Sequence, residues 1–72
     1  MATQIWQHII NGERFAVETD AQGLVIGAAG PLHESDVELA KAGDWVADSA
    51  LTEILRETAS QYRDVTRHVE YR

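Results

Sequence analysis

Apolar and polar positions alternate along the first half of the chain, which is typical of β-strands. β-branched and aromatic residues are concentrated at positions 3–10, the alternation continues through 13–19, and a third apolar run covers 24–29. Asn11-Gly12 separates the first two runs, and this dipeptide is a strong signal for a two-residue hairpin turn. A second turn signal, the segment Asp20-Ala-Gln-Gly23, precedes the third run. The pattern predicts a three-stranded antiparallel β-meander.

The period of the apolar positions becomes helical in the second half. Ser35-x-x-Glu38 matches a capping box and predicts a short helix over about 35–42. Asp44 is a candidate N-cap for a longer helix over about 45–66, in which apolar residues recur near every 3.6 positions. We therefore predict an α+β fold of the order βββαα, in which a three-stranded antiparallel β-meander is followed by a short and a longer α-helix. One domain is expected over residues 1–72.

The predicted turns assign each strand residue to one of two sheet faces. One face would carry Trp6, His8, Ile10, Phe15, Val17 and Val25, and the other Ile5, Ile9, Ala16, Leu24, Ile26 and Ala28. Helices that follow a meander normally cover one face only. We expect them on the face of Trp6, which leaves the second face apolar and uncovered.

An uncovered apolar face usually marks an interaction surface. The residues predicted to make this apolar contact are Ile5, Ile9, Leu24 and Ile26. The alternative is that a bulge at Gly23 or Gly27 shifts the register, or that the two helices lie on opposite sides of the sheet.

The composition narrows the classes of partner. The 72 residues include no cysteine and carry a net charge of −6. A chain this short has a marginal core and cannot use disulfides, which favours oligomerisation, as a homodimer, as the source of added stability. The negative charge argues against direct contact with nucleic acid or with an anionic membrane. The lack of cysteine, of a signal peptide and of a membrane-length apolar run fits a cytoplasmic protein.

Acidic residues dominate the predicted helical half. Seven acids and two basic residues fall within 32–59, a net charge of −5. Such a stripe is commonly a solvated helix surface, but it also suits docking onto a basic, nucleic-acid-binding protein. The residues predicted for this electrostatic contact are Glu34, Asp36, Glu38, Asp44 and Asp48.

No motif in the sequence strongly indicates a catalytic, metal-binding or nucleotide-binding site. The three histidines lack the spacing of a helical metal pair, the serines lack a nucleophile-elbow context, and the glycines at 27 and 30 do not form a phosphate loop. We therefore expect no catalytic residue, no metal and no cofactor, and a protein that is not an enzyme. The alternative function is a small-molecule or nucleotide binder that uses a cleft between sheet and helices, lined by Trp6, His8 and Trp45, or a dimer seam.

One stretch of sequence resembles a pattern found in small phage-encoded proteins. In the strand that follows the second turn, the matching residues are Gly23, Val25, Ala28, Ala29 and Pro31. The resemblance implies a virus or mobile element as the source and no site residues. In size and charge the chain is also similar to phage inhibitors of host defence nucleases, such as anti-CRISPR proteins. The function we expect is therefore a non-enzymatic protein-binding module, an inhibitor that docks on a larger host protein such as a nucleic-acid-binding defence complex.

Overall fold

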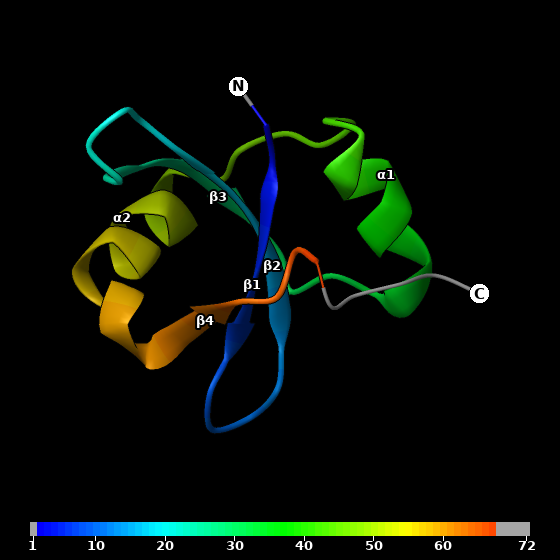
Figure 1. Cartoon of the computed structure of the whole chain (residues 1–72), viewed down its shortest axis with the longest axis horizontal. Helices are drawn as coiled ribbons and strands as arrows, with labels where there is room; N and C mark the ends of the chain where they lie inside the picture. The colour runs from blue at the N-terminus through cyan, green and yellow to red at the C-terminus, as the bar shows by residue number, and fades with distance from the viewer. Residues whose placement is uncertain (1, 68–72) are drawn as a thin grey trace.

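The computed structural model describes residues 2–67 and shows one sheet between two helices (Figure 1). Four antiparallel strands lie in the order β3-β2-β1-β4. The strands are β1 (Gln4–His8), β2 (Arg14–Thr19), β3 (Val25–Ala29) and β4 (Tyr62–Asp64), and the helices are α1 (Val37–Lys41) and α2 (Ser49–Glu57). Short 3₁₀ turns precede α1 at Glu34–Asp36 and follow α2 at Ala59–Gln61. The α+β class and the three-stranded meander are confirmed, and a fourth strand is added to them.

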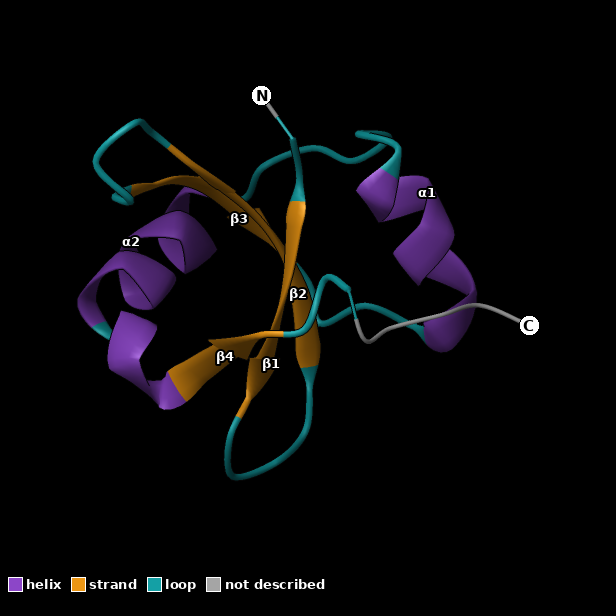
Figure 2. Ribbon diagram, in the orientation of Figure 1, coloured by secondary structure: helices purple, strands orange, loops and turns teal. Residues whose placement is uncertain are grey.

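Strand β4 replaces the C-terminal part of the predicted long helix. The backbone N–H of Ile9 donates to the carbonyl of Gln61 at 3.0 Å, and that of Val65 donates to Ile5 at 2.8 Å, so this segment pairs with β1. The Tyr62 ring also packs edge-on against Phe15 at 5.6 Å. These contacts reach across the chain, so they override a local helical period that the sequence carries. Figure 2 shows the change from α2 to β4 within a few residues.

The helix starts also differ from the sequence prediction. Ser35 lies in a 3₁₀ turn and makes no capping hydrogen bond, and the first α-helix begins only at Val37. The second helix is capped by Asp48, whose side chain accepts a hydrogen bond from Leu51 N at 3.1 Å, rather than by Asp44. Gly43 follows the first helix with a φ of 88°, a conformation that glycine adopts without steric cost.

The first hairpin has a longer loop than Asn-Gly predicts. Trp6 pairs with Phe15, so four residues, 9–12, form the loop instead of two. The Nδ1 atom of His8 accepts from Ile10 N at 3.2 Å, and Gly12 N donates to the His8 carbonyl at 3.0 Å, which closes the longer turn. The resulting register shift is two residues, an even number, so every β1 side chain keeps its predicted face.

A bulge in β3 does change the faces. Thr19 pairs with Val25 as predicted, but Glu18 pairs with Gly27, so Ile26 is the extra residue. Beyond the bulge, Ala28 joins the face of Val17 instead of the face predicted for it. The bulge beside Gly27 is the alternative that the sequence left open.

Each helix covers a different face of the sheet (Figures 1 and 2). On the α2 side the buried cluster is Phe15, Val17, Val25, Ala28 and Leu55, and on the α1 side it is Ile5, Ala16, Val37, Ala40 and Val65. The prediction of an uncovered apolar face is therefore wrong. Each helix has one apolar side, and one such side is enough to cover one cluster. Two short helices on opposite sides of the sheet therefore cover both of its apolar faces.

Candidate functional site

The outer edge of β3 is covered by α2 and by the loop that leads into it. Asp48 N donates to the carbonyl of Ala28 at 2.8 Å, and the Ala28 N–H donates to Thr52 Oγ1 at 3.0 Å. Arg56 Nε donates to the carbonyl of Val25 at 3.0 Å. These bonds occupy backbone groups that an edge strand otherwise offers to a further strand. This edge is therefore closed to strand addition at Val25 and Ala28.

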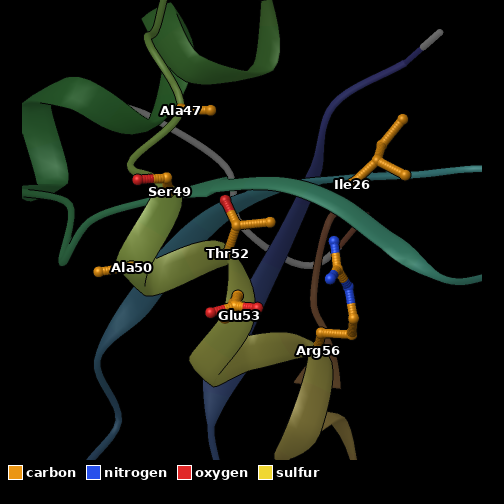
Figure 3. A pocket seen from close by; sticks show the side chains of 7 residues that line it. All are labelled: Ile26, Ala47, Ser49, Ala50, Thr52, Glu53 and Arg56. Atoms are coloured by element: carbon orange, nitrogen blue, oxygen red, sulfur yellow. The ribbon is translucent and has the colours of Figure 1, made fainter.

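An open groove of about 440 Å³ lies between this edge and the helix (Figure 3). Its lining is a mixture of small, apolar and charged side chains, namely Ile26, Ala47, Ser49, Ala50, Thr52, Glu53 and Arg56. Figure 3 shows Ile26 and Arg56 on opposite sides of the β3 ribbon, with Glu53 one helical turn before Arg56. The groove is a shallow surface that suits a protein side chain better than an enclosed ligand.

Exposed apolar side chains flank this groove. Leu24 is 50% exposed, Ile26 45% and Val46 88%. Ile26 is the extra residue of the bulge, so it has no partner on β2 and remains at the surface. The 44–48 loop runs against β3. A Cβ atom added at Gly27 would lie only 3.5 Å from the Cβ of Ala47.

We call this region the β3-edge surface and define it by its exposed members: Leu24, Ile26, Val46, Ala47, Asp48, Glu53 and Arg56. It carries two carboxylates and one guanidinium, so its net charge is negative. An apolar centre with an acidic margin is complementary to a partner that presents aliphatic and basic side chains.

The structure brings together three of the nine residues that the sequence predicted for contact. Leu24, Ile26 and Asp48 fall on the β3-edge surface, whereas Asp44 lies at the end of α1, where its backbone N–H donates to the Leu39 carbonyl at 2.9 Å. Ile5 does not, because α1 covers it completely and its exposed fraction is 0%. The prediction that Ile5 contacts a partner is therefore wrong.

The other nominated residues lie elsewhere. Ile9, 64% exposed, is in the hairpin loop. Glu34, Asp36 and Glu38 belong to the 3₁₀ turn and α1, which pack against the opposite side of the sheet from α2. The acidic residues therefore do not form one continuous helical face, because the sheet separates the two helices that carry them.

Sequence reasoning missed Val46, Glu53 and Arg56 as parts of the surface. Val46 stands between Trp45 and Ala47 in a segment that the sequence predicts as helix, so no separate sequence signal identifies it. No sequence signal identifies Arg56, because its partner, the Val25 carbonyl, is 31 positions away and depends on the tertiary fold.

The aromatic residues proposed to line a ligand cleft do not share one. Trp6 packs with the α2-side cluster, and His8 stacks edge-on against Tyr62 at 4.9 Å. Trp45 packs against the α1-side cluster and donates from Nε1 to Thr3 Oγ1 at 2.9 Å. The sheet lies between these two sets, so a single pocket lined by all three is wrong.

Residues 2–67 contain neither a grouped set of metal ligands nor a membrane-spanning helix. Within this range, no three His, Cys, Asp or Glu side chains are grouped as metal ligands. The helices in the same range are too short and too polar for any of them to cross a membrane.

Comparison with known proteins gives no relative. No protein-family model, no curated protein and no solved structure matches the chain.

Proposed function

We propose that this chain is a protein-binding module that acts without catalysis and contacts its partner through the β3-edge surface. The observation that carries the proposal is the exposure of Leu24, Ile26 and Val46 beside a groove, whereas Ile5, Phe15, Val17 and Val25 of the sheet are buried. Exposed aliphatic side chains forgo hydrophobic stabilisation, of about 1.5–3 kcal/mol for each that is fully buried. Such groups gathered at one place are typical of an interface.

The charge of the surface indicates the chemistry of the partner. Asp48 and Glu53 border the apolar centre, and the chain as a whole has a net charge of −6. Long-range attraction then favours a protein with a basic face, and it increases the association rate more than the final affinity. A host nucleic-acid-binding protein has such a face, which agrees with the inhibitor function suggested by the similarity in size and charge to phage inhibitors of host defence nucleases.

Site-specific photo-crosslinking tests the location of the surface. A photoreactive amino acid in place of Val46 is expected to cross-link one basic protein from host cells, and the yield is expected to fall as salt rises. The matched control carries the same group in place of Ile10, which is 86% exposed in the hairpin loop and outside the β3-edge surface. Equal yields from the two positions, or a yield independent of salt, would contradict the proposal.

A pair of substitutions tests the apolar and acidic contributions separately. Ile26→Asp is expected to reduce cross-linking from position 46 at all salt concentrations, because it places a charge in the apolar centre. Glu53→Lys is expected to reduce it mainly at low salt, because it alters the electrostatic attraction. Light scattering of the purified chain distinguishes a second copy from a different protein as the occupant: a dimer that Ile26→Asp dissociates would replace the proposed basic partner with self-association.

A further inference from the structure

A second cavity lies on the other side of the molecule, between the start of β2 and the loop before α1. Its volume is about 350 Å³, and its lining consists of Gly12, Glu13, Arg14, Pro31, Leu32 and His33. The two walls are joined by a backbone hydrogen bond from Leu32 N to the Arg14 carbonyl at 2.8 Å. The cavity shares no lining residue with the groove at β3.

Arg14 is unusual among the lining residues. Its Nε atom is buried, yet it has no hydrogen-bond partner among residues 2–67. The side chain as a whole is only partly buried, and it lines the cavity. A buried donor without a partner is costly, and in native proteins such a group is normally satisfied by a water, an ion or a ligand.

The surroundings favour an anion as that ligand. His33 adds an imidazole ring, with its own nitrogen atoms, to the lining, and it is exposed. The one acidic side chain in the lining, Glu13, is engaged locally, because Asn11 Nδ2 donates to its Oε1 at 3.1 Å and Asn11 Oδ1 accepts from its backbone N–H at 2.9 Å. The Glu13 carboxylate is thereby held on the hairpin loop, and the Arg14 guanidinium is left as the strongest donor in the cavity.

From these observations we infer that the Arg14 cavity binds a carboxylate, with the guanidinium of Arg14 as the principal donor and His33 as a second. A planar carboxylate can accept two parallel hydrogen bonds from one guanidinium, and Arg14 contributes such a group to the cavity lining. The net charge of −6 opposes a multiply charged ligand more strongly than a singly charged one, which favours a carboxylate over phosphate. This inference does not depend on the β3-edge surface.

Nuclear magnetic resonance of the arginine side chains tests it directly. The full chain is titrated with sodium acetate at constant ionic strength, and the Nε–Hε signals of Arg14 and Arg63 are followed together. We expect a saturable shift of the Arg14 signal and of the Leu32 and His33 amides at millimolar acetate. Arg63 is exposed on β4 and is expected to show no saturable shift.

Two variants and a second anion decide the outcome. Arg14→Gln is expected to abolish the saturable shift of the Leu32 amide, and Arg14→Lys to weaken binding about tenfold, because an ammonium lacks the fork geometry. Arg63→Gln is the matched control and is expected to leave binding unchanged. A non-saturable response of Arg14 in the native chain would overturn the site even if Arg14→Gln does not fold, and tighter binding of phosphate than of acetate would overturn the carboxylate assignment.

Discussion

Thr52 shows how one hydroxyl group joins a helix to the edge of a sheet. The side chain is 7% exposed, and its Oγ1 accepts from Ala28 N at 3.0 Å while donating to the Asp48 carbonyl at 2.7 Å. Both roles of the hydroxyl are used, and both partners are backbone groups. Position 52 therefore fixes α2 against β3 through polar contacts as well as through packing.

Replacement of Thr52 by valine tests this connection with almost no change in shape. Thr52→Val leaves the Ala28 N–H without an acceptor in a buried position, so we expect the free energy of unfolding to fall by about 1–3 kcal/mol. Denaturant unfolding measures the loss, and amide hydrogen exchange at Ala28 localises it. Thr52→Ser retains the hydroxyl and is expected to keep the Ala28 amide protected; loss of protection in both variants would refute the assigned role of the hydrogen bond.

At the scale of elements, the caps determine where the helices begin. The sequence offers several acidic residues before the second helical run, and the apolar period alone favours Asp44. In the structure, residues 44–47 remain outside the helix because Trp45 packs on the α1-side cluster and Ala47 lies against Gly27. Asp48 is the first residue free to cap, and the helix starts there.

Substitution of Asp48 and of Asp44 tests which aspartate caps the second helix. Asp48→Ala removes the acceptor for Leu51 N, and we expect it to lower the free energy of unfolding by about 1 kcal/mol. Asp44→Ala removes an exposed carboxylate with no capping role, so its effect should be within about 0.5 kcal/mol. Thermal and denaturant unfolding of both variants check the order, and a larger loss for Asp44→Ala would place the cap where the sequence predicted it.

The contrast between β1–β3 and β4 shows which elements local sequence can predict. Each meander strand carries its own alternation and adjoins a turn signal, so its existence follows from neighbouring residues. Strand β4 has three residues and depends on pairing with β1, more than fifty positions earlier. The candidate site follows the same rule: Leu24 and Ile26 could be nominated from the strand pattern, whereas the groove beside them required the position of α2.

At the scale of the whole molecule, the division of the helices between two faces determines which apolar residues are core. Ile5 and Ile26 were assigned to one exposed face by sequence, yet they differ in exposure, at 0% and 45%. The difference arises from α1, which closes over Ile5, and from the bulge, which moves Ile26 outward. Register alone could not distinguish them, because neither event is encoded in the strand period.

Truncation of these two isoleucines measures the two-sided core. Ile5→Ala is expected to cost about 2–5 kcal/mol, a large fraction of the stability of a domain this small. Ile26→Ala is expected to cost less than about 1 kcal/mol, because that side chain is already half in water. Chemical unfolding with circular dichroism provides both values. Similar losses for the two variants would mean that α1 does not seal its side of the sheet.

The closure of β3 by α2 also limits how copies of this domain can polymerise. Lateral growth of a sheet needs an available margin on each subunit, and a fibre needs two margins per subunit so that addition can continue. Here Asp48, Thr52 and Arg56 occupy one margin internally. Within residues 2–67, only the β4 side is left for strand addition, and two copies joined there would have consumed it. Strand pairing between folded copies is therefore expected to stop at a pair joined through β4, because addition at β3 requires α2 to leave Val25 and Ala28 first.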